Sequence, residues 1–78
     1  MRAFFVQIKC DLGKSYDVAN AIADAEIASE IFSTAGEYGL LVKFYLPDGE
    51  DIGHFIAQKV QTIAGIRDTF TIVTFKAF

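Results

Sequence analysis

The stretch TAGEYGLLVKF, residues 34–44, joins a glycine-containing turn to the most strand-like run of the chain. Gly36 and Gly39 can adopt a positive φ at little steric cost, so the backbone can reverse direction within a few residues. After Gly39, apolar side chains alternate between two faces of a strand that we expect to span residues 40–46. This pattern predicts a β-hairpin. The turn also concentrates glycines, a carboxylate and an aromatic ring, so we expect any binding site to lie here.

The rest of the chain alternates between strand-like and helix-like patterns. Strands are expected over about residues 4–10, 28–34 and 69–75. An amphipathic helix is expected from Ser15, which can cap its N-terminus, to about residues 25–27. An alternative is that this helix continues to Glu30. A second helix is expected to follow Asp48 as its cap and to end at Gly65.

This element order predicts an α+β fold of the ferredoxin-like type, β-α-β-β-α-β. Right-handed crossovers place both helices on one face of a four-stranded antiparallel sheet. At 78 residues the chain is short, so we expect residues 1–78 to form a single domain.

The face of the sheet opposite the helices would be left uncovered. Large apolar residues are expected on it, namely Phe5, Leu41, Tyr45 and members of the set Thr71, Val73 and Phe75. With 53% hydrophobic residues, so small a domain has more apolar surface than it can easily bury alone. The simplest cover is a face-to-face homodimer whose interface includes Phe5, Leu41, Tyr45 and Val73.

Charge, hydropathy and cysteine usage narrow the function classes. The formal net charge is −3 and the seven Lys and Arg residues are scattered, which argues against direct nucleic-acid binding. No segment approaches the roughly 20 apolar residues of a membrane span. Cys10 is the only cysteine, so we expect a cytoplasmic protein without an internal disulfide. His54 has no ligand or orienting partner at suitable spacing, so we expect no metal, cofactor or catalytic residue.

The element order, the run AGEYGLLVK at residues 35–43 and the ending IAGIRDT at residues 63–69 together resemble one family. They are similar to the effector-binding half of Lrp/AsnC transcription regulators, also called the RAM domain. The resemblance spans nearly the whole chain. It implies a dimeric α/β barrel that assembles further into rings and binds amino acids or similar small effectors between dimers. The chain begins with its first strand, so it resembles the stand-alone form without a helix-turn-helix, which would act through a DNA-binding regulator of the same family.

The resemblance also implies which residues bind the effector: Gly36, Glu37, Tyr38, Gly39, Asp68, Thr69 and Thr71. The family turn usually reads Thr-Gly-x-Tyr-Asp, and here Ala35 and Gly39 stand in the places of its Thr and Asp. The missing hydroxyl and carboxylate are groups suited to an α-amino group. We therefore expect ordinary amino acids to bind weakly, with millimolar dissociation constants.

Two other functions are compatible with the same fold. One is a small cofactor-free oxygenase or isomerase, which would bind its substrate inside the barrel and place a His, Tyr, Asn or Trp there. Here the expected interior is Phe, Val, Ile and Leu, the chain has no Trp, and His54 should face outward. The other is a purely structural partner of larger regulators, which differs from the effector-binding module only in lacking a ligand. The non-enzymatic effector-binding module is the favoured interpretation.

Overall fold

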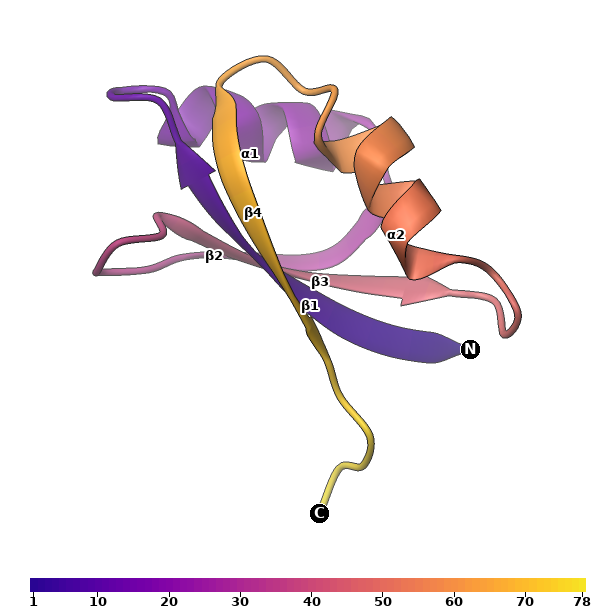
Figure 1. The fold of residues 1–78 in the computed structure, drawn as a ribbon. Helices are drawn as coiled ribbons and strands as arrows, with labels where there is room; N and C mark the ends of the chain where they lie inside the picture. Colours follow the sequence, from indigo (N-terminus) through magenta and orange to yellow (C-terminus); the bar gives the residue numbers. More distant parts are fainter.

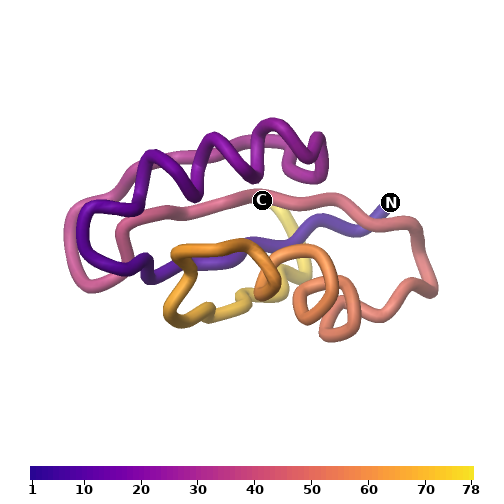
Figure 2. Tube along the Cα trace, turned by 90° about the horizontal axis from the view of Figure 1, so that it is seen from above, coloured from indigo at the N-terminus to yellow at the C-terminus, as the bar shows by residue number.

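A computed structural model describes all residues from 1 to 78. The elements in chain order are β1 (Arg2–Cys10), α1 (Ser15–Asp24), β2 (Ala28–Ser33), β3 (Leu40–Leu46), α2 (Ile52–Phe55), a π-helical segment η1 (Ile56–Val60) and β4 (Ile66–Val73). The strands form one antiparallel sheet in the order β2-β3-β1-β4. Both helices cover the same face of this sheet (Figure 1), and Figure 2 shows them side by side from above. The predicted ferredoxin-like α+β fold is confirmed.

The hydrophobic core lies between the sheet and the two helices. Alternate residues of β1 and β3 point into it, as the period-two pattern predicts. The Phe55 ring of α2 packs edge-on against Phe4 and Phe44, at centroid distances of 6.1 and 5.4 Å. Eleven side chains are buried: Phe4, Val6, Ile8, Val18, Ile22, Leu40, Val42, Phe44, Leu46, Ile56 and Val60. None of them is polar, so apolar burial holds the helices on this face.

The boundaries of α1 differ from those expected. Its N-cap is Lys14, whose side chain makes no capping hydrogen bond, and Ser15 is already the first helical residue. The helix ends at Asp24, and Glu26 beyond it adopts a left-handed φ of 55°. This reversal turns the chain into β2, which begins at Ala28, so the alternative of a helix continuing to Glu30 is wrong.

The cap of α2 is Asp51, not Asp48. The Asp51 carboxylate accepts a hydrogen bond from the backbone N–H of His54 at 3.1 Å. Asp48 instead lies in a turn in which the N–H of Glu50 donates to the Pro47 carbonyl at 3.2 Å. That turn delays the start of the helix and separates Asp48 from its first N–H groups.

The second helix also ends earlier than expected. After Phe55 its hydrogen bonding changes to the π pattern, in which the N–H of Gln61 donates to the Ile56 carbonyl at 2.8 Å. Gly65 lies in the following turn with a φ of 94°, and a Cβ there would stand 3.0 Å from Val18 Cγ2. Gly65 therefore lets the turn before β4 approach α1 closely, instead of ending the helix.

The pairing of β4 with β1 corrects the predicted faces of β4. Val73 lies opposite Phe4 and Thr71 lies opposite Val6, so both residues point toward the helices. The expectation that Val73 and Thr71 lie on the open face is wrong, and Phe75 lies beyond the end of the strand. The more apolar residues of β4, Phe70 and Ile72, alternate with these and point to the open face, so composition alone would place the faces of β4 the wrong way round.

The open face is nevertheless strongly apolar. Phe5, Leu41 and Tyr45 lie on it as predicted, because they alternate with the buried residues of β1 and β3. The Lys43 ammonium stands among them, 5.7 Å from the Phe5 ring centroid and 5.2 Å from that of Tyr45. The register adds three further residues, Phe32, Phe70 and Ile72, which are 48%, 55% and 38% exposed. None of the helices has the length and hydropathy needed to cross a bilayer.

Candidate functional site

The turn between β2 and β3 is closed by hydrogen bonds from Thr34. Its N–H donates to the Gly39 carbonyl at 2.9 Å, and its Oγ1 donates to the Tyr38 carbonyl at 2.6 Å. Gly36 has a φ of 116°, as predicted for a glycine turn. Gly39 lies outside the left-handed region, contrary to the prediction, and a Cβ there would stand 3.1 Å from Ser15 Oγ. The turn is thus packed against the start of α1.

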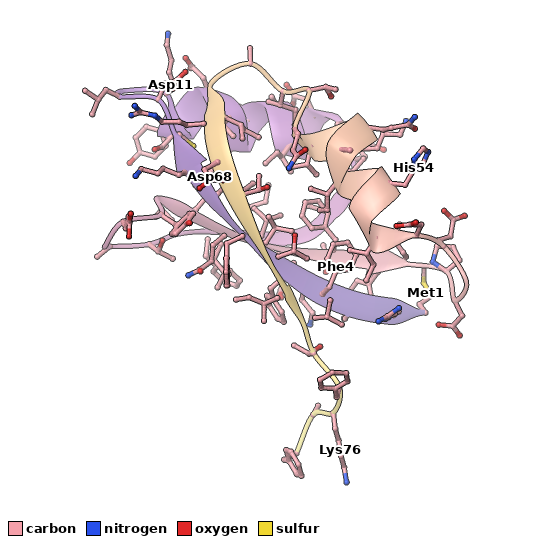
Figure 3. The ribbon with its side chains drawn as sticks, viewed as in Figure 1. Met1, Phe4, Asp11, His54, Asp68 and Lys76 are labelled. Atoms are coloured by element: carbon pink, nitrogen blue, oxygen red, sulfur yellow. The ribbon has the colours of Figure 1, made fainter.

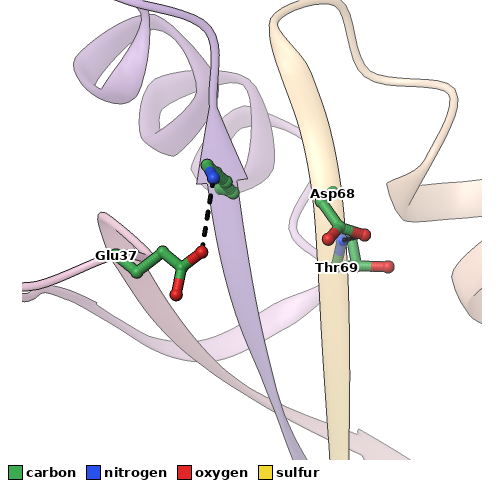
Figure 4. A network of polar contacts seen from close by, with 4 residues as sticks. Glu37, Asp68 and Thr69 are labelled. Atoms are coloured by element: carbon green, nitrogen blue, oxygen red, sulfur yellow. Dashed lines mark hydrogen bonds and ion pairs between the residues drawn. The ribbon is translucent and has the colours of Figure 1, made fainter.

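Three of the predicted turn residues, Gly36, Glu37 and Gly39, line an open polar cleft of about 250 Å³. Its other walls come from the end of β1, the loop before α1 and the start of β4, and they bring Lys9 and Arg67 to the same cleft. Lys9 Nζ stands 3.5 Å from Glu37 Oε1 (Figure 4). Charges of both signs therefore converge beside the turn.

Tyr38 lies next to this cleft, on the open face of the sheet. Its ring centroid is 6.4 Å from that of Phe70, and the side chain is half-buried. Partial removal from water, together with the carboxylates of Asp68 and Glu37, raises the pKa of the Tyr38 phenol. The phenol therefore stays protonated at neutral pH and remains a hydrogen-bond donor. Asp68 lies opposite Lys9 in the ladder, at the end of the sheet near Asp11 (Figure 3).

Thr69 and Thr71 do not reach the turn within one chain. They lie opposite Ile8 and Val6 and so point to the helix-covered face. The hydroxyl oxygen of Thr69 accepts a hydrogen bond from Gln61 Nε2 at 2.9 Å. Of the predicted effector residues, these two are separated from the others by the thickness of the sheet.

Sequence reasoning missed most of the cleft, including Lys9, Ser15 and Arg67. They come from β1, α1 and β4, and only the fold brings them to the turn. No local pattern in the sequence marks them. Cys10 also borders the cleft, and burial raises the pKa of its thiol in spite of a hydrogen bond with Ser15. This thiol is therefore protonated at neutral pH, in agreement with its interpretation as a packed and weakly reactive side chain.

His54 is exposed on α2 and points away from the core (Figure 3), as predicted. The space between the sheet and the helices contains no buried polar or charged side chain. The turn and the sheet end beside it, in contrast, carry several polar groups that could contact a small molecule.

Comparison with known proteins identifies the family of the chain. The sequence profile described as the Lrp/AsnC ligand binding domain matches residues 3–78. The chain belongs to the Lrp/AsnC family. It is 29% identical over 72 residues to the HTH-type transcriptional regulator FL11 of Pyrococcus abyssi, a match that covers 92% of this chain and 47% of that protein. The chain thus spans about half the length of the curated regulators that it matches.

Solved structures show the same fold in chains of similar length. A protein from Thermus thermophilus is 27% identical, with a TM-score of 0.88 over 100% of this chain and 98% of that one. A hypothetical protein from Pyrococcus horikoshii is 25% identical, with a TM-score of 0.84 over 99% of this chain and 93% of that one. The resemblance to the RAM domain is therefore confirmed.

Proposed function

We propose that this Lrp/AsnC domain is a non-enzymatic module that binds a small amino-acid-like effector and assembles into oligomers. Effector binding would modulate a DNA-binding partner of the same family. The observation that carries the proposal is the cleft: the turn that resembles the family's effector motif, Gly36–Gly39, borders a polar hollow of about 250 Å³. This volume lies just below the range of roughly 300–1,000 Å³ that is typical of sites for drug-sized ligands, so it suits a smaller molecule.

The chemistry of the cleft suits a small zwitterion. The Glu37 carboxylate can accept hydrogen bonds from an ammonium group, and Ser15 and the turn backbone supply further polar atoms. The protonated Tyr38 phenol and the Asp68 carboxylate extend the polar surface toward the open face. The cleft is open on one side, so a second copy of the chain placed against it would enclose the ligand, and Thr69 or Thr71 could be contributed by that copy.

Assembly would begin with a homodimer formed through the open face. Phe5, Leu41 and Tyr45 provide an apolar patch, which Phe32, Phe70 and Ile72 enlarge. Apolar patches of this kind mark association surfaces. Dimers would then associate into a ring-like oligomer, with the Gly36–Gly39 turns at the contacts between them.

The proposal also covers the location of the protein, its domain organisation and its contact with DNA. The chain would act in the cytoplasm, and residues 1–78 would act as one effector-binding domain. With a net charge of −3, it would contact DNA only through its partner. The oxygenase or isomerase alternative is disfavoured because the space between sheet and helices is filled by apolar side chains.

Calorimetric titration with the standard L-amino acids tests effector binding. The natural chain should bind its best ligand with a millimolar dissociation constant, and Gly39→Asp should bind it more tightly because it restores a carboxylate for the α-amino group. The new Cβ would stand 3.1 Å from Ser15 Oγ, so Ser15 must shift slightly.

The matched control is Gly39→Ala, which introduces the same Cβ without the carboxylate and should not tighten binding. Absence of binding in both the natural chain and Gly39→Asp would refute an amino-acid effector. Micromolar binding by the natural chain would instead show that the missing Thr and Asp groups are dispensable.

A further inference from the structure

We propose that Arg67, together with Lys9, binds the carboxylate of the effector, so that the ligand must be a zwitterion with a free carboxylate and not merely an amine. This inference rests on the proposed function and deepens it, because it assigns a role to residues outside the turn.

Arg67 reaches the cleft because β4 contains a β-bulge. The ladder between β1 and β4 runs regularly up to the pair of Lys9 with Asp68, and the next pair is Cys10 with Ile66. Arg67 is therefore the extra residue of the bulge, without a partner on β1. A bulge bends the strand locally and changes the direction of a side chain, which is why bulges are frequent beside binding sites. Here the cleft that contains Glu37 has Arg67 as one of its lining residues.

The Arg67 guanidinium is an unpaired cation. The ion pairs of the chain join the N-terminus to Asp48, Lys9 to Glu37 and Lys14 to Asp17, and Arg67 takes part in none of them. A guanidinium presents planar donors that match both oxygens of a carboxylate. Arg67 is thus chemically suited to a carboxylate that the chain itself does not supply.

The charges of the cleft as a whole match a zwitterion. Lys9 and Arg67 are balanced by Asp11 and Glu37, so a ligand with one charge of each sign adds no net charge. The Lys9–Glu37 pair is exposed, with side chains 37% and 74% accessible, and exposed pairs of this kind contribute little stability. The ligand can therefore separate them, placing its ammonium on Glu37 and its carboxylate between Lys9 and Arg67.

NMR chemical-shift titrations measure millimolar binding and test this assignment. The probes are the standard L-amino acids and, for each one that binds, its α-amide, which keeps the ammonium but lacks the carboxylate. We expect Arg67→Gln to weaken amino-acid binding by about tenfold or more, as loss of a charge-assisted pair does. Lys9→Gln should have a smaller effect in the same direction, and Arg67→Lys should restore part of the affinity.

The matched control is Lys59→Gln, which removes the same charge from the exposed surface of η1, away from the cleft. It should leave the affinity unchanged. The amides should bind the natural chain about as weakly as the acids bind Arg67→Gln. Suppose that the amino acids bind, and that the dissociation constant of Arg67→Gln stays within about twofold of that of the natural chain. Such a shift is too small for the loss of a charged pair. It would overturn this inference and leave the proposed function standing. If no amino acid binds the natural chain, both fall.

Discussion

At the scale of single residues, Tyr38 has a pKa that its position beside the proposed site raises. Its phenol is half-buried against Phe70 and lies near the carboxylates of Asp68 and Glu37. Burial and these two negative charges raise the pKa of the phenol above the ordinary value of 10.0. The pKa of Tyr38 is higher in the folded state than in the unfolded state. The neutral phenol therefore makes its full contribution to the free energy of unfolding at any pH below the unfolded-state pKa. It is lost as the pH rises through the folded-state pKa.

Phenolate absorbance measured during a pH titration should therefore contain a component with a midpoint above 10.0 that is missing in Tyr38→Phe. The free energy of unfolding should fall more in the natural chain than in Tyr38→Phe as the pH rises through this range. Replacing Asp68 with Asn should lower the midpoint, since one of the two carboxylates is removed. A midpoint that is the same with and without Asp68 would contradict the assigned cause.

Glu26 is the residue other than glycine that adopts a left-handed φ, at 55°. It follows the C-cap of α1, a position where glycine is favoured because it has no Cβ to clash with the backbone. Glu26→Gly should raise the free energy of unfolding by about 0.5–1 kcal/mol, measured by urea denaturation. Glu26→Ala removes the same charge but keeps the Cβ, so it should give no such gain. Equal effects of the two variants would point to charge instead of backbone strain.

At the scale of elements, the short helix α2 depends on its cap. α2 has four α-helical residues before the π segment begins, so it has few internal hydrogen bonds to spare. Asp51→Ala removes the acceptor for the His54 N–H and should lower the free energy of unfolding by about 1 kcal/mol.

Asp48→Ala is the matched control for the cap. Its carboxylate only contacts the N-terminal ammonium at 3.8 Å, with both groups well exposed. This change should therefore cost less than about 0.5 kcal/mol. Urea denaturation of the two variants measures the difference directly, and a larger loss in Asp48→Ala would reverse the assignment of the cap.

At the scale of the whole molecule, the open face is the surface through which we expect the protein to dimerise. Leu41→Asp places a charge in the middle of this face, and burying it without a partner would be strongly unfavourable. We expect the natural chain to sediment as a dimer or larger oligomer at micromolar concentration, and Leu41→Asp to sediment as a monomer. Ala57→Asp adds the same charge on the exposed side of the helix layer and should leave assembly intact. A natural chain that sediments as a folded monomer would refute the dimer.

Alternation by itself determined β1 and β3. In each of them every second residue is apolar and buried, and the intervening residues differ enough in polarity to fix which face turns inward. Glycine and proline mark their ends, so the hairpin, the sheet and the helix-covered face could be predicted from local sequence. The same local signals predicted the Gly36–Gly39 turn, which borders the cleft of the proposed site.

Only the tertiary structure decided the face of β4 and the composition of the cleft. The more apolar residues Phe70 and Ile72 lie on the open face and Val73 lies toward the helices, a placement that follows from pairing with β1 and not from composition. The bulge at Arg67 is likewise a property of two paired strands. Lys9 and Arg67 are distant from the turn in sequence and meet it only because antiparallel pairing brings β1, β3 and β4 to one end of the sheet. Contacts between distant segments leave no local pattern, and for that reason the cleft could not be read from the chain.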